Sequence, residues 1–339
     1  MNSNHCDYSS VSRVLGRRAF LGMIATSSLA IRIPRASQAA VRRLLKPVRI
    51  GVIADLHHDI MHDGIDRLQA FIERMSIDQP DAILQLGDFA FPRASNAKVI
   101  ELFNGSHERA LHVIGNHDMD AGLTRQDCMN VWGMPAPHYV RKIGDLHLLV
   151  LDGNDAGSPS YTGGYPSYVG SEQVAWLKAR LDSIDGPVLV ASHQPLAGVS
   201  AVDNAEEIQS ILGDSADKVL LAINGHTHMD EMLRVRGVTY LHVNSASYKW
   251  VGGQFGHESY PKSIHDAHPS ISRTCPYRDP LFATLVIDPA TMTIRVVGAR
   301  SSWVGPSPEE LDVPLPAGLT AGEQVSPRIR DRRIVRTGD

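Results

Sequence analysis

From Val48 onward the chain repeats one pattern, in which a short apolar run ends abruptly in polar residues and a segment of helical periodicity follows. The run VRIGVI ends at ADLHHD, and the runs DAILQ and ALHVI end at LGD and GNHD. After the first run, helical spacing relates Leu68, Phe71, Ile72 and Met75. Short buried strands that alternate with helices are typical of an α/β domain.

The later part of the domain favours hairpins. Residues 138–152 predict a hairpin with its turn at Gly144 and Asp145, and 231–243 and 281–299 predict two more. Helices are expected around 99–103 and from Ser171, which we assign as an N-cap. Together these patterns predict a layered α/β domain with mixed sheets over residues 46–304, and an extended or disordered tail over 305–339.

The first segment, 1–39, has the order of an export signal. Arg17 and Arg18 precede a short apolar stretch, which is followed by the small residues ASQAA. The paired arginines resemble a twin-arginine (Tat) signal, and the apolar stretch is shorter than the ~20 residues that span a bilayer. We therefore expect the Tat export machinery as a partner, a periplasmic or secreted protein, and no stable membrane anchor.

The charge of the chain argues against one class of partner, and its cysteine spacing excludes one class of metal site. The chain has 33 Lys and Arg against 37 Asp and Glu, so no global positive field favours a long nucleic acid as partner. A zinc ribbon is excluded because the CxxC spacing is absent, whereas a disulfide between Cys128 and Cys275 stays open.

Polar clusters follow five of the predicted strands at the point where each strand ends. In α/β folds functional residues gather beyond the carboxyl ends of strands, so these clusters predict one shared site. Its candidate members are Asp55, His57, Asp88, Asn116, His117, Asp118, His193, His226 and His228.

These residue types indicate what the site binds. Carboxylate and amide oxygens mixed with imidazoles suit transition metals, whereas Mg²⁺ and Ca²⁺ prefer oxygen ligands alone. There are more potential ligands than one tetrahedral ion needs, so we predict two divalent or trivalent ions that share a carboxylate, with Fe, Mn or Zn favoured.

The ordered motifs D-x-H (Asp55, His57), G-D (Asp88), G-N-H-D (115–118), a lone His193 and G-H-x-H (225–228) resemble those of the calcineurin-like metallophosphoesterases. The resemblance implies a four-layer α/β/β/α sandwich, in which two mixed sheets lie between helices and a dinuclear metal site lies at the strand ends.

The resemblance also implies residue roles. Asp55, His57 and His228 would bind the first metal, Asp88 would bridge, and Asn116, His193 and His226 would bind the second. His117 would be the catalytic residue near the leaving-group oxygen, and Asp118 would orient its imidazole. His58 is expected to be a neighbour of the site and not a ligand.

The function implied is hydrolysis of a small phosphomonoester or phosphodiester by a metal-bridging hydroxide. Alternatives are a nucleotidase or cyclic-nucleotide phosphodiesterase of the same fold, and a catalytically silent metal-binding or interaction module. Asn154 and Arg93 are candidate substrate contacts, although GDFAFPR differs from the GDxVDRG of protein phosphatases. Tyr165 could line a substrate pocket or pack within its loop.

Overall fold

The computed structural model describes residues 43–316, 319 and 324–335, and the predicted signal segment, 1–39, lies outside them. The described residues fall within one compact unit. It contains two six-stranded sheets, ordered β14-β13-β12-β1-β2-β3 and β4-β5-β6-β7-β9-β8. Among the described residues, no helix is both long and apolar enough to cross a membrane.

The first sheet combines a parallel half and an antiparallel half. Its strands are β1 (Val48–Ile53), β2 (Ala82–Gln85), β3 (Ala110–His112), β12 (Ala283–Asp288), β13 (Thr293–Val297) and β14 (Arg332–Val335). The first three are parallel to one another, and β12 joins β1 in antiparallel register. The carboxyl ends of β1, β2 and β3 therefore lie at the same edge.

The second sheet has a parallel centre with an antiparallel strand at each edge. Its strands are β4 (Tyr139–Ile143), β5 (Leu146–Val150), β6 (Val188–Ser192), β7 (Val219–Asn224), β8 (Glu231–Val235) and β9 (Val238–His242). The strands β5, β6, β7 and β9 run parallel, and the predicted hairpins β4–β5, β8–β9 and β12–β13 are all present. Gly144, with a φ of 58°, makes the first of these turns.

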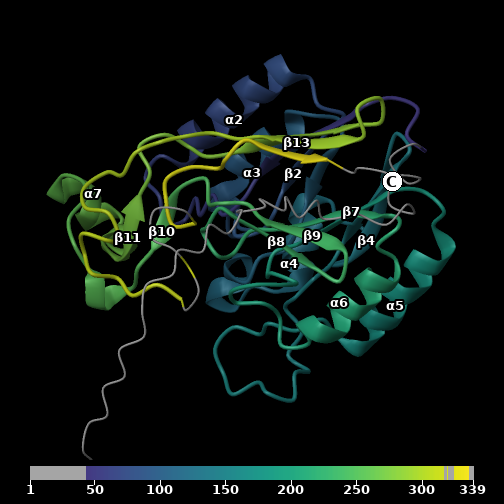
Figure 1. Cartoon of the computed structure of the whole chain (residues 1–339). Coiled ribbons are helices and arrows are strands. Elements are labelled where there is room, and N and C mark those ends of the chain that lie inside the picture. The colour runs from purple at the N-terminus through teal and green to yellow at the C-terminus, as the bar shows by residue number, and fades with distance from the viewer. Residues whose placement is uncertain (1–42, 317–318, 320–323, 336–339) are drawn as a thin grey trace, which may run out of the picture. The chain divides into compact units, whose positions relative to one another are not determined.

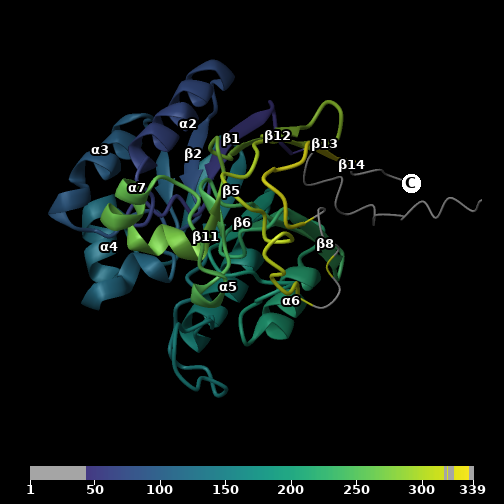
Figure 2. The same ribbon diagram turned by 90° about the vertical axis from the view of Figure 1, so that its left-hand side faces the viewer.

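Helices cover the outer faces of both sheets. On the first sheet lie α2 (Gly64–Asp78) and α3 (Ala97–Gly105), and on the second lie α5 (Ser171–Ser183) and α6 (Ala205–Asp214), as Figures 1 and 2 show. The strands of the second sheet bury alternate residues against different partners. Leu148 and Leu189 join the core shared with the first sheet, whereas Leu149 and Val190 pack with the side chains of α5 and α6. The sequence expectation of two mixed sheets flanked by helices is confirmed.

Several smaller elements were not predicted. They are α4 (Arg125–Trp132), α7 (Lys262–Ala267) and a two-stranded sheet formed by β10 (Tyr248–Trp250) and β11 (Thr274–Pro276). The helix α5 does begin at Ser171, but Gly170 is its N-cap, so the predicted cap at Ser171 was one residue late. Cys128 and Cys275 are both buried and free, and no disulfide joins them.

Part of the tail that was predicted to be extended or disordered is a paired strand. Arg332–Val335 forms β14 and pairs with β13. Asp230, which is fully buried, accepts Arg330 Nε at 2.7 Å and Arg332 Nη1 at 2.6 Å. These ion pairs attach the tail to the loop that follows β7. Sequence periodicity did not reveal this because the partner of both arginines lies 100 and 102 residues away.

We predict that Asp230→Ala lowers the free energy of unfolding by about 2–3 kcal/mol, because it leaves two partly buried guanidinium groups without their carboxylate. Urea denaturation followed by circular dichroism measures this loss. Asp182→Ala, at an exposed position on α5, is the matched control and should change stability by less than about 0.5 kcal/mol. An equal change in the free energy of unfolding in both variants would contradict a stabilising role for the ion pairs of Asp230.

Candidate metal centre

The polar clusters of five strands meet at one place, where the carboxyl ends of the two sheets face each other. Asp55 and His57 follow β1, Asp88 follows β2 and Asn116 follows β3. From the second sheet, His193 follows β6, and His226 and His228 follow β7. Two groups result, each with ligand atoms within 4.8 Å of one another: Asp55, His57 and His228, and Asp88, His193 and His226.

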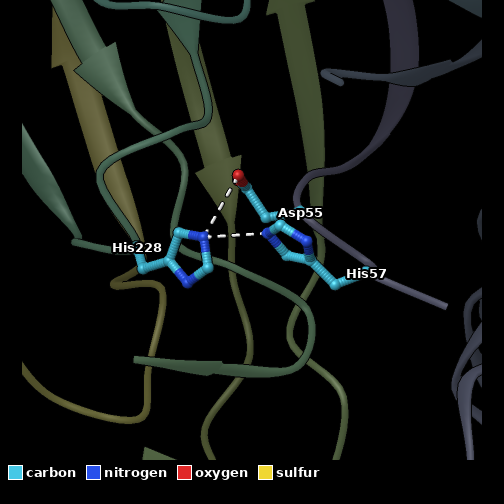
Figure 3. A group of neighbouring side chains, drawn as sticks. All are labelled: Asp55, His57 and His228. Carbon is cyan, nitrogen blue, oxygen red and sulfur yellow. Dashed lines mark hydrogen bonds and ion pairs between the residues drawn. The ribbon is translucent and has the colours of Figure 1, made fainter. Parts of the chain in front are cut away.

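In the first group three side chains from two sheets point to one place (Figure 3). His228 Nε2 lies 3.3 Å from His57 Nε2 and 3.3 Å from Asp55 Oδ1. His228 Nδ1 donates to the carbonyl oxygen of Tyr248 at 2.7 Å, so its Nε2 presents a lone pair to the other two atoms. A cation fits this arrangement, because it neutralises Asp55 and accepts all three lone pairs.

The second group repeats this design with an added amide. His193 Nε2 lies 3.2 Å from Asp88 Oδ2, 3.1 Å from Asn116 Oδ1 and 3.2 Å from His226 Nδ1. His193 Nδ1 donates to the carbonyl oxygen of Leu86 at 2.8 Å, which directs Nε2 toward the group. All four ligand positions predicted for the second metal are therefore together.

Asp88 connects the groups. Its Oδ2 lies 3.2 Å from His193 Nε2 and 3.6 Å from His57 Nε2, and its Oδ1 accepts the backbone N–H of His117 at 2.8 Å. One carboxylate thus contacts ligands of both predicted metals. This is the position expected for a bridging ligand.

Burial keeps two of the imidazoles neutral. It lowers the pKa of His57 well below its ordinary value, and burial together with His193 lowers the pKa of His226 to about 3. Burial also lowers the pKa of His193, but Asp88, together with Asp55 and the Leu86 carbonyl, raises that pKa to about 9. A metal ion on His193 therefore displaces a proton, whereas on His57 and His226 it meets a free lone pair.

The backbone is strained at five of the ligands. Positive φ angles between 46° and 67° occur at Asp55, His57, Asp88, His226 and His228. Residues other than glycine rarely adopt this backbone conformation, and each such residue lowers the stability of the fold by about 1 kcal/mol or more. Such strain persists only where the surroundings hold it, and here it turns successive ligands toward one point.

Two motif glycines are required by close approach. A Cβ on Gly87 would lie 2.4 Å from His193 Nδ1, and Gly87 also has a φ of 94°. A Cβ on Gly115 would lie 2.2 Å from the backbone nitrogen of Asp88. The loops after β2 and β3 could not pack around Asp88 with any larger residue at these positions.

The segment that follows β9 supports the loop after β1, which carries Asp55 and His57. Ser245 Oγ donates to the carbonyl oxygen of Asp55 at 2.8 Å, and Ser247 Oγ donates to that of Leu56 at 2.7 Å. The ring of Tyr248 stacks on His57 with a centroid distance of 5.0 Å. The sequence NSASY contained no recognised motif, so these supporting residues were not predicted.

His117 lies beside both groups, but its partner differs from the prediction. Its Nδ1 bonds to Asp120 Oδ2 at 2.8 Å, and the hydroxyl of Tyr165 donates to Asp120 Oδ1 at 2.7 Å. The prediction that Asp118 orients this imidazole is wrong. The short 3-10 helix after Asn116 turns Asp118 into the core and Asp120 toward the ring.

Asp118 instead organises the backbone around the bridging ligand. Its carboxylate accepts the N–H groups of Asp88 at 2.9 Å, Phe89 at 2.8 Å, Ala90 at 3.3 Å and Gly115 at 2.8 Å. It therefore joins the loops that follow β2 and β3. The GNHD spacing could have suggested such a role only with knowledge of the backbone that Asp118 faces.

The predicted substrate contacts lie outside the centre. Asn154 is buried, and its side chain is bonded to Asp152, to the Ile114 carbonyl and to Gln194. Arg93 is exposed and donates to the Ala121 carbonyl. His58 belongs to neither ligand group, as the D-x-H spacing indicated.

Two cavities open onto the centre. One is lined by Ile60, Phe89, Phe91 and Ser270 among others, and the second by Val199, Lys249 and Arg273 among others. Tyr165 lines the second cavity, so it both contacts the His117–Asp120 pair and borders a pocket. Of these residues only Tyr165 was singled out from sequence.

We predict that His57→Ala lowers the bound metal by about one equivalent per chain, whereas His58→Ala retains the wild-type content, because only His57 contributes to a ligand group. Elemental analysis of the purified full-length proteins measures this. Equal metal content in the two variants would contradict the assignment.

A family profile matches the part of the chain that contains the metal centre. Residues 48–230 match the profile of the calcineurin-like phosphoesterases. Comparison with curated proteins gave no match.

Solved structures share the fold at low sequence identity. A dimetal phosphatase from Danio rerio is 15% identical, with a TM-score of 0.54, and the alignment covers 76% of this chain and 98% of that one. GAP50 of Plasmodium, described as an anchor in the inner membrane complex, is 13% identical, with a TM-score of 0.50 and coverage of 77% and 85%. The purple acid phosphatase PPD1 from yellow lupin is 13% identical, with a TM-score of 0.50 and coverage of 84% and 53%.

The profile match spans more than half of the chain and contains every predicted metal ligand. The chain belongs to the calcineurin-like phosphoesterase family.

Proposed function

We propose that this protein is an exported phosphohydrolase that uses two transition-metal ions, Fe, Mn or Zn, to hydrolyse small phosphomonoesters or phosphodiesters. The observation that carries the proposal is the contact of Asp88 Oδ2 with ligands of both groups, at 3.2 Å and 3.6 Å, directly beside His117. Mixed nitrogen and oxygen ligands favour these metals over Mg²⁺ and Ca²⁺.

When bound, two such ions supply charge neutralisation for a phosphate group and activate water as the nucleophile. The chain supplies the geometry. The buried Asp55 and Asp88 compensate the metal charge, and the carbonyl oxygens of Leu86 and Tyr248 fix the rings of His193 and His228. The open cavities give an ester access to this centre.

His117 is the proton donor in this proposal. Asp120 accepts the Nδ1 hydrogen of the ring, so the proton that passes to the leaving-group oxygen is the Nε2 proton of the doubly protonated ring. Tyr165 donates to the other oxygen of Asp120 and so holds the carboxylate in place. Asp120 acts through His117 and is a positioning residue.

Two alternative functions are compatible with the same site. A nucleotidase or cyclic-nucleotide phosphodiesterase would use the same residues. A silent binding module is the alternative of another class, and the reason to consider it is that GAP50, which shares the fold, is described as an anchor.

Export rests on Arg17 and Arg18, and replacement of both by Lys should retain the protein in the cytoplasm.

We predict that metal-loaded wild-type protein hydrolyses p-nitrophenyl phosphate or bis(p-nitrophenyl) phosphate, and that Asp88→Ala retains less than about 1% of this activity, because both metal sites lose a ligand. Release of p-nitrophenolate measures the rate. Equal rates in the two proteins would remove the dinuclear mechanism, and a metal-loaded wild type without turnover would favour the binding module.

For the proton donor, we predict that His117→Ala lowers kcat by about 100-fold with the metal content retained. Asp120→Ala should lower kcat by about tenfold, because the ring loses its orienting partner. Asp185→Ala, at an exposed position outside both ligand groups and both cavities, is the matched control. Loss of both metals in His117→Ala would show that His117 is a ligand.

A further inference from the structure

Two cavities open onto the metal centre. The first, which we call the Phe91 cavity, has a volume of about 300 Å³, and the second, the Arg273 cavity, has about 590 Å³. Four residues line both of them: His57, Asp88, His117 and Trp250. A phosphate held by the two ligand groups would therefore have space for organic groups in two adjoining cavities.

The Phe91 cavity is apolar and carries negative charge. Its walls include Ile60, Phe89 and Phe91. Besides Asp88, three carboxylates line it, and each is already bonded: Asp59 to Phe91 N and Asn96, Asp118 to backbone N–H groups, and Asp120 to His117 and Tyr165. Asp59 and Asp120 need no further cation, but they repel an anion. A neutral, apolar group fits here.

The Arg273 cavity has the opposite charge. Lys249 and Arg273 line it, and among the described residues that line it Asp88 is the only one with a carboxylate. Lys249 Nζ donates one hydrogen to the Thr227 carbonyl at 2.8 Å and has others to donate, and the side chain of Arg273 is exposed. Arg273 directly precedes β11, and Lys249 pairs with Cys275 across the small sheet. The β10–β11 sheet therefore presents two cations to this cavity.

We propose that the substrate is a phosphodiester that lies across the metal centre, with a neutral apolar group in the Phe91 cavity and a negatively charged organic group in the Arg273 cavity. This inference rests on the proposed function and narrows it. A monoester has one organic group and would occupy one cavity only. A diester uses both, and the opposite charges of the cavities set its direction.

The first experiment compares kcat/KM of the metal-loaded full-length protein for bis(p-nitrophenyl) phosphate and p-nitrophenyl phosphate. We expect the diester to be preferred by at least about tenfold. Ser270→Trp narrows the Phe91 cavity and Val199→Trp narrows the Arg273 cavity, so each should lower the diester-to-monoester ratio by about tenfold. Ser263→Trp, exposed on α7 and outside both cavities, is the matched control and should keep the ratio.

A wild-type preference for the monoester, or tryptophan variants that keep the wild-type ratio, would overturn the inference while the phosphohydrolase function stands. Absence of turnover of both esters by metal-loaded wild type would overturn the proposed function itself. Metal content and circular dichroism equal to those of the wild type confirm that each variant folds. Variants that fail this check are replaced by Ser270→Phe and Val199→Phe, to which the same outcomes apply.

The second experiment tests the charge of the Arg273 cavity with two diesters that differ by one phosphate. These are thymidine 5′-(p-nitrophenyl phosphate) with and without a 3′-phosphate, and both report through p-nitrophenolate. We expect about a tenfold lower KM for the form with the 3′-phosphate, a loss of this difference in Arg273→Gln, and its partial rescue in Arg273→Lys. Equal KM values in the wild type, or a difference that survives in Arg273→Gln, would overturn the direction assigned to the substrate.

Discussion

The placement of the Asp88 carboxylate is the constraint on which the rest of the site depends. One of its oxygens lies within reach of a histidine from each ligand group, and the other accepts the backbone N–H of His117. The carboxylate is buried, so its charge is not screened by water. The predicted metal ligands from both sheets and His117 are therefore arranged around a single side chain.

Holding Asp88 there requires support from several loops. Asp118 accepts four backbone N–H groups and joins the loops after β2 and β3, and Ser245 and Ser247 hold the loop after β1. Asp230, two residues beyond His228, attaches the C-terminal strand to the loop after β7. These contacts offset the cost of positive φ angles at five ligands. Strain and support occur together because ligand loops must turn sharply at the strand ends.

The sequence predicted most of the site because its motifs are short. Asp55 and His57, or His226 and His228, are separated by one residue, and their strands were recognisable from apolar runs. The sheets and three hairpins were predicted for the same reason, since alternation and turn residues are local signals. Contacts between distant segments were not predicted. The role of orienting His117 was assigned to Asp118, whereas Asp120 has it in the structure. Only the turn of the backbone after Asn116 decides which carboxylate faces the ring.

The amino-acid sequence by itself determined which chemistry the protein carries: the identity of the ligands, their order, and the strands that bring them to one edge. Tertiary structure alone decided what surrounds that chemistry. Residues far apart in the chain form the β10–β11 sheet and the ion pairs of Asp230 with Arg330 and Arg332. Such residues also give the two cavities their different charges. Ligand motifs are local because a metal needs its donors within a few ångströms, whereas a substrate cavity is enclosed by whichever loops the fold brings together.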